Sequence, residues 1–151
     1  MKELAVDVQP GDPYANSYHA YIVTADGRTA EGIAHAERAV RLDPLAVRGP
    51  HLNILGLASF YAGEYQGAPD AFLKSKVRGG PFMSVHQAHI VAAYTALGSV
   101  DEAREQLKYL EEYGDNWATS PLLHIFRRLE DAEKLFGPIR ELGNQPQTRA
   151  Y

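Results

Sequence analysis

Histidines are the residues of this chain whose types and spacing could support chemistry, namely metal binding. His86 and His89 are three residues apart on one expected helix, and His51 takes the corresponding place in the preceding helical segment. Imidazoles that meet across neighbouring helices can bind zinc, nickel or copper. Because no carboxylate is evidently placed to complete such a set, we predict no metal site, and these three residues are the candidates that metal analysis would test. His19 is expected to be a core residue, and His35 carries no distinguishing signal.

The other residue patterns of catalysis are missing from the sequence. There is no cysteine, which excludes disulfides, thiolate metal sites, iron–sulfur clusters and a cysteine nucleophile. The chain has no Gly-x-Ser-x-Gly, His-Glu-x-x-His, Gly-x4-Gly-Lys-Ser/Thr or Gly-x-Gly-x-x-Gly motif. Its carboxylates are spread over expected helix exteriors. We therefore predict that the protein is not an enzyme and uses no cofactor.

The composition is that of an ordinary globular protein. The 151 residues suffice for one core or a short stack of repeats, and 45% of them are hydrophobic and 23% charged. A net charge of -4 and a pI near 5.8 lack the basic footprint of a nucleic-acid binder. The longest apolar run is about half of the roughly 20 residues that span a bilayer, and the N-terminus lacks a signal-peptide pattern. We expect a cytoplasmic protein that contacts neither nucleic acid nor membrane.

Three glycines mark an internal repeat. Gly27, Gly63 and Gly98 each follow an apolar helical stretch and precede another, at separations of 36 and 35 residues. Five positions after each glycine stands a small residue, and four positions further stands an apolar one; these are Gly32, Ala68 and Ala103, then Ala36, Phe72 and Leu107. No long stretch alternates with the period of a strand. The pattern predicts an all-α protein built from repeated helical hairpins.

These residues resemble the tetratricopeptide repeat, in which large-x2-Leu-Gly-x2-Tyr is followed by Ala-x3-Phe and then by Pro. The middle copy matches best, with Leu52, Leu55, Gly56, Gly63, Tyr65, Ala68 and Phe72 in register. The other copies depart from the pattern, with Asn16 and Gln87 at the first large position. The resemblance implies a right-handed superhelical array of antiparallel helix hairpins. A further stretch, from Phe126 to Gly143, is similar to the way such repeats end in bacterial adenylate cyclases and winged-helix regulators.

The helix ranges follow from the apolar spacing and the turns. They are Pro13–Ala25, Thr29–Leu42, Pro50–Ala62, Tyr65–Arg78, Ser84–Leu97 and Val100–Tyr113, then a capping pair at about Pro121–Arg128 and Glu130–Leu142. Pro69 is tolerated only in the first turn of its helix. Ser99 and Glu102 have the form of a capping box at a helix start.

We expect one domain over residues 1–151 with about three repeats. Its parts are residues 13–48, 49–83 and 84–116 as repeats, 117–143 as capping helices and 144–151 as a flexible tail. Residues 1–12 read as the remnant of a preceding repeat whose first helix is absent, which would make the chain a fragment. The alternative is a genuine start with a stray helical turn.

In such an array the first helix of each hairpin lines a concave face. That face defines the predicted partner-binding groove, formed by Tyr14, Ser17, Tyr21, Asn53, Leu57, Phe60, Tyr61, Ala88, Ala92 and Thr95. Tyrosine presents a large rigid area with a polar tip, which suits recognition. We expect a non-catalytic interaction scaffold that holds an apolar or aromatic peptide or helix there.

Two alternatives stay open. The chain could be the regulatory or sensory module of a signalling enzyme or transcription regulator, detached from its effector domain. It could also pair with a second copy as a homodimer through its aromatic surface.

Overall fold

The fold is that of a computed structural model, which describes residues 9–46, 48–114, 116–124, 126 and 129–144. Within these residues the chain forms helices and no strand, so the predicted all-α class is confirmed. The α-helices are α2 (Pro13–Ala25), α3 (Thr29–Leu42), α4 (His51–Tyr61), α5 (Gly67–Val77), α6 (Ser84–Ala96), α7 (Val100–Tyr113) and α8 (Leu129–Asn144). Two 3-10 turns, η1 (Trp117–Thr119) and η2 (Pro121–Leu123), lie between α7 and α8. Residues 1–8 of the remnant predicted over residues 1–12, and most of the predicted tail, lie outside the described residues.

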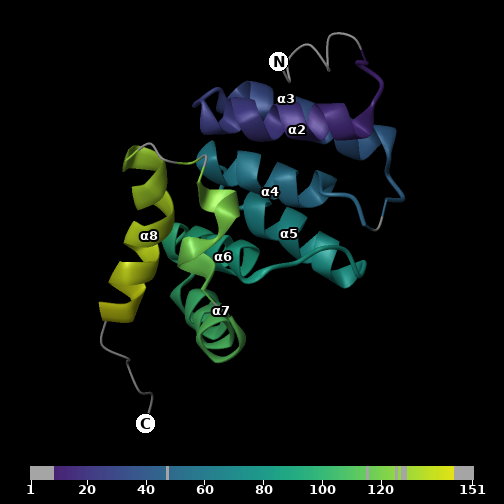
Figure 1. Ribbon diagram of the computed structural model, residues 1–151. Coiled ribbons are helices and arrows are strands. Elements are labelled where there is room, and N and C mark those ends of the chain that lie inside the picture. The colour runs from purple at the N-terminus through teal and green to yellow at the C-terminus, as the bar shows by residue number, and fades with distance from the viewer. Residues whose placement is uncertain (1–8, 47, 115, 125, 127–128, 145–151) are drawn as a thin grey trace.

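The helices pack as successive hairpins (Figure 1). Helix α2 packs on α3, α4 on α5, and α6 on α7. The first helices α2, α4 and α6 contact one another in turn, and the second helices α3 and α5 contact the first helix of the next hairpin. Helix α8 lies beside this stack, inclined to the hairpins, and packs mainly on α6 (Figure 1). None of the described helices has the length and hydropathy needed to cross a bilayer.

The three repeat glycines close their hairpins with one shared turn. Gly27, Gly63 and Gly98 have φ values of 86°, 82° and 77°, a region that side chains with a Cβ rarely adopt. In each turn the glycine N–H donates to the carbonyl three residues earlier, and the next N–H donates to the carbonyl five residues earlier. This is the Schellman pattern, which satisfies the last carbonyls of a helix. The same bonds surround Gly79, which joins the second hairpin to the third.

Small residues let the two helices of a hairpin approach closely. A Cβ built on Gly56 would lie 2.8 Å from the ring of Phe72, which is fully buried. A Cβ on Gly32 would overlap the Thr24 side chain of the facing helix. Helices α4 and α6 are buried along most of their length because they have neighbours on several sides, whereas α3 and α7 bury only one stripe.

Helix ends follow the sequence closely, with one exception. Asp12 caps the start of α2, where its carboxylate accepts the Ala15 N–H at 3.0 Å, and Pro69 falls in the first turn of α5 as expected. The predicted capping box is wrong, because the Ser99 side chain makes no cap hydrogen bond. The Ser99 backbone is held in the preceding turn instead, where its N–H donates to the Tyr94 carbonyl at 2.9 Å.

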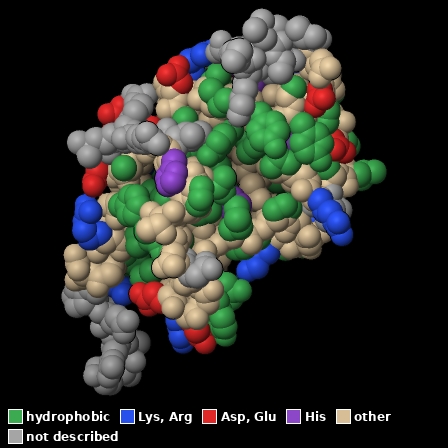
Figure 2. Space-filling view, viewed as in Figure 1, with side chains coloured by type: hydrophobic (Ala, Val, Ile, Leu, Met, Phe, Trp, Pro, Cys, Tyr) green, Lys and Arg blue, Asp and Glu red, His purple; other side chains and the backbone are tan. Residues whose placement is uncertain are grey.

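The predicted capping pair is only half present. In place of a helix at Pro121–Arg128, the described part of that segment forms the single turn η2. Only α8 is a full helix, and it turns Leu135 and Leu142 inward while Glu130, Glu133 and Arg140 stay exposed. A view of the same face with all atoms shows hydrophobic side chains over the first hairpin and the middle of the stack, with charged side chains around the edge (Figure 2).

Candidate functional site

The predicted groove is not open. Seven of its ten residues are buried, with exposed fractions of 5% or less: Ser17, Asn53, Leu57, Phe60, Tyr61, Ala88 and Ala92. Tyr21 and Thr95 are half-buried, and only Tyr14 is exposed, at 46%. The expectation of an exposed aromatic wall beside a trough of small residues is therefore wrong for this structure.

The chain covers Tyr21 and Tyr61 of this face with its own C-terminal part, whereas Ser17 is buried against His51 and Asn53 against the Pro81 carbonyl. The Tyr21 hydroxyl donates to the Leu122 carbonyl at 2.7 Å. The Phe126 ring stacks on Tyr61 with centroids 4.2 Å apart and planes 10° apart, and meets Tyr21 edge-on at 5.7 Å. Lys134 Nζ donates to the Tyr61 carbonyl at 2.9 Å. We call η1, η2, Phe126 and α8 together the C-terminal cover.

The three histidines singled out by the sequence have separate structural roles. His89 is fully buried; its Nδ1 donates to the Val85 carbonyl at 2.7 Å, which leaves Nε2 to accept the Tyr61 hydroxyl at 2.9 Å. His86 Nδ1 accepts the Met83 N–H at 3.0 Å and so caps the start of α6. Burial lowers the pKa of His89 to about 3 and that of His86 to about 4, so both rings are neutral at pH 7.

His51 contacts Ser17 and Asp43 and neither of the other two histidines. Its Nδ1 lies 2.6 Å from the Ser17 hydroxyl, and its Nε2 lies 3.6 Å from a carboxylate oxygen of Asp43. Burial lowers the pKa of His51 although Asp43 acts in the opposite direction. Within the described residues, the one cluster with metal-ligand spacing includes none of the three predicted histidines.

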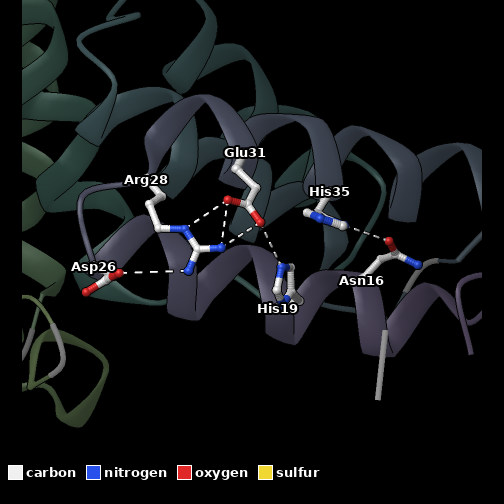
Figure 3. A network of polar contacts seen from close by, with 6 residues as sticks. All are labelled: Asn16, His19, Asp26, Arg28, Glu31 and His35. Carbon is white, nitrogen blue, oxygen red and sulfur yellow. Dashed lines mark hydrogen bonds and ion pairs between the residues drawn. The ribbon is translucent and has the colours of Figure 1, made fainter. Parts of the chain in front are cut away.

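That cluster consists of His19, Glu31 and His35, whose ligand atoms all lie within 4.8 Å of one another. His19 comes from α2, and Glu31 and His35 come from one face of α3, four residues apart (Figure 3). Neither histidine was expected to have a site role. A detectable signal was present, because Glu31 and His35 have the i, i+4 spacing of a shared helix face and His19 lies on the partner helix of the same hairpin.

Charge at the cluster is balanced by Arg28. Its Nε donates to one Glu31 oxygen at 2.9 Å and its terminal nitrogen to the other at 2.8 Å (Figure 3). Hydrogen bonds from Arg28 and from His19 lower the pKa of Glu31. Burial, reinforced by the charge of His19 when it is protonated, lowers the pKa of His35. The carboxylate is thus ionised at pH 7 and the His35 ring neutral.

A second feature lies at the other end of the stack. A cleft of about 600 Å³ opens between α6, α7 and η1. Its apolar lining includes Phe82, Met83, Tyr109, Tyr113 and Trp117, and we call it the aromatic cleft. Met83, Tyr109 and Tyr113 are exposed at 46%, 45% and 67%.

The edge of the aromatic cleft carries a cation. Lys76 Nζ lies 4.9 Å from the ring centroid of Phe82 and 4.6 Å from that of Tyr109. Such contacts between an ammonium group and ring faces are attractive. The sequence did not point to this cleft, because it forms only where η1 folds back onto the last hairpin.

No family model, curated protein or solved structure matches the chain. The function is therefore argued from the chain's own residues. Three places stand out: the covered concave face, the His19–Glu31–His35 cluster and the aromatic cleft.

Proposed function

We propose that this chain is a tetratricopeptide-like repeat module without catalytic activity that binds an apolar segment of a partner protein in the aromatic cleft. The repeat assignment is supported by the three hairpins that close on glycines in the same Schellman turn. It is supported also by the close packing of Gly56 on Phe72, two positions of the repeat pattern.

The single observation that carries the binding proposal is the exposure of large side chains in a concave place. Met83, Tyr109 and Tyr113 keep about half or more of their surface in water while they line a cleft of about 600 Å³. Clusters of exposed apolar side chains in a hollow are typical of interaction sites. Tyrosines act as rigid anchors there because they lose little entropy on binding.

The lining also indicates what kind of segment would fit. Phe82 and Trp117 offer ring faces for an aromatic or branched aliphatic side chain. Ser120 and Asn116 offer polar groups for the backbone of an extended or helical segment. Lys76 at the edge favours a carboxylate next to the apolar anchor.

A selection from a displayed peptide library tests this proposal. The immobilised full chain is expected to enrich peptides with an aromatic or aliphatic anchor and an adjacent acidic residue. Replacing an anchor tyrosine, in Tyr109→Ala or Tyr113→Ala, removes a hot-spot contact and should weaken the selected peptides by roughly 30-fold. Isothermal titration calorimetry with a synthetic peptide measures this loss.

Tyr18→Ala is the matched control, because Tyr18 is an exposed tyrosine on α2, far along the chain from the cleft. It should bind the selected peptide like the parent chain. Peptides that bind Tyr113→Ala and the parent equally would overturn the assignment of the cleft. Light scattering at two concentrations shows whether a second copy of the chain occupies it instead.

A further inference from the structure

The first hairpin holds a set of donor atoms that the proposed peptide binding does not use. His19 and His35 supply ring nitrogens and Glu31 a carboxylate oxygen, all within 4.8 Å of one another. The set spans the two helices, so anything that bound all three would fasten α2 to α3 (Figure 3). Two imidazoles and one carboxylate are the protein ligands of many zinc sites with an open fourth position.

The hydrogen bonds around His35 determine which of its nitrogens is available. Asn16 Nδ2 donates to the carbonyl oxygens of Pro10 and Asp12 at 3.0 and 2.9 Å. The other amide atom, Oδ1, is therefore an acceptor, and it lies 3.0 Å from His35 Nδ1. His35 Nδ1 must carry the proton of the neutral ring, which leaves a lone pair on Nε2. Metal-bound histidines are oriented in this way by an acceptor behind the ring.

His19 supplies an independent observation. Its side chain is 6% exposed, and its Nδ1 is buried without a hydrogen-bond partner. Because a carboxylate oxygen only accepts, His19 Nε2 carries the proton toward Glu31 in the neutral ring, and a metal ion at Nε2 would move that proton to Nδ1. Its Nε2 lies 3.3 Å from Glu31 Oε1. Two ligand atoms at the usual zinc distances in a tetrahedral site are about 3.3 to 3.5 Å apart.

The Arg28 guanidinium contacts the Glu31 carboxylate that a metal ion would also bind. Its terminal nitrogen lies 2.8 Å from Oε1, the oxygen that also faces His19, and 2.8 Å from Oε2, to which its Nε also donates. A metal ion at Oε1 would compete with the terminal nitrogen alone and leave the Nε bond in place. Glu31 is 39% exposed, which gives an ion a path from solvent.

We propose that His19, Glu31 and His35 bind one divalent transition-metal ion of zinc type. The ion bridges the two helices of the first hairpin, and its fourth position faces solvent. This site is separate from the aromatic cleft, so the metal-binding proposal does not depend on whether the cleft binds a peptide.

Titration of the full chain with metal tests the proposal. The protein is treated with EDTA, desalted and titrated with ZnCl2 in a calorimeter, and CoCl2 provides a visible spectrum. One zinc ion per chain is expected, together with a higher melting temperature and the intense absorption of tetrahedral cobalt. His35→Gln and Glu31→Gln should each weaken zinc binding at least tenfold, and His19→Gln should do the same.

Two further variants make the result specific. His124→Gln removes an exposed histidine outside the cluster and should leave zinc affinity unchanged. Arg28→Gln removes a donor that competes with the metal ion for the Glu31 carboxylate, and a positive charge that repels the ion. It should tighten zinc binding severalfold. Zinc affinity that is equal in the parent and in His35→Gln, with both folded by circular dichroism, would overturn the proposal. So would a loss of binding in His124→Gln.

Discussion

Two surfaces of this molecule are rich in aromatic side chains, and only one of them is covered. On the concave face of the first helices, Tyr21 and Tyr61 contact Phe126 of the C-terminal cover. At the aromatic cleft, Tyr109 and Tyr113 pair with each other at a centroid distance of 4.9 Å but stay exposed. The same residue type thus serves intramolecular packing at one place and stays exposed to solvent at the other.

The difference teaches that residue type alone does not identify a binding surface. A tethered segment is present at a high effective concentration, so a groove with good anchors is filled by the chain itself when the chain can reach it. The concave face has such a segment, joined to α7 by a short connection. Substitutions on the covered face should therefore change stability, whereas substitutions in the aromatic cleft should change binding.

Removing the main ring of the C-terminal cover is the strongest test of this contrast. Phe126 is 4% exposed and lies between Tyr61 and Tyr21. Phe126→Ala should lower the free energy of unfolding by about 3 to 5 kcal/mol, because it deletes buried contacts and leaves a cavity. Urea denaturation followed by circular dichroism measures the loss.

Hydrogen exchange locates the same effect. Amides of α8 should lose protection in Phe126→Ala more than those of α3, which lies away from the cover. Leu45→Ala is the control, since Leu45 is 88% exposed and its removal should cost less than about 0.5 kcal/mol. If Phe126→Ala cost no more than Leu45→Ala, the cover would not be packed as described.

Acid should weaken the folded state through two buried histidines of α6. The folded pKa values of His86 and His89 lie at about 4 and about 3, below the ordinary value of 6.5. Between pH 6.5 and 4 the unfolded chain binds protons that the folded chain does not, so stability is full above pH 6.5 and falls as the pH drops. The slope is up to about 1.4 kcal/mol per pH unit for each ring.

Urea denaturation at several pH values between 6.5 and 5 measures this slope. His89→Gln and His86→Gln should each reduce it, whatever they do to stability at pH 7. His124→Gln, at an exposed position, should leave it unchanged. A slope that is the same in all four proteins would contradict the burial of His86 and His89 as neutral rings.

The helical hairpins could be predicted from sequence because their signals are local. The ranges of α2, α3 and α7 match the expected ones, since glycine turns, apolar spacing and Pro13 at a first turn act within a few residues. The error at Pro121–Arg128 arises where local signals and distant contacts disagree. A proline and two leucines look like a helix start, but the segment is shaped by its contacts with Tyr21 and Tyr61 of distant helices.

The candidate site could be predicted less well because it depends on contacts between elements. The groove residues were placed on the correct helices, yet the exposure of Tyr21 and Tyr61 depended on where Phe126 and α8 would lie. The cluster around His35 needed a pairing of α2 with α3 in register, and the aromatic cleft needed the fold of η1. The spacing of residues along one helix reveals neither the pairing of α2 with α3 nor the position of η1.

The smallest expected effect completes the contrast between the two surfaces. Tyr113 is 67% exposed at the mouth of the aromatic cleft, so Tyr113→Ala should change the free energy of unfolding by less than about 0.5 kcal/mol. The same variant should lose most of its affinity for a selected peptide, because the exposed ring becomes buried only in the complex. Urea denaturation and calorimetry on one protein preparation compare the two quantities. A large loss of stability would mean that the Tyr113 ring is part of the packed fold, like the rings under the C-terminal cover, and the loss of affinity could then be a consequence of unfolding.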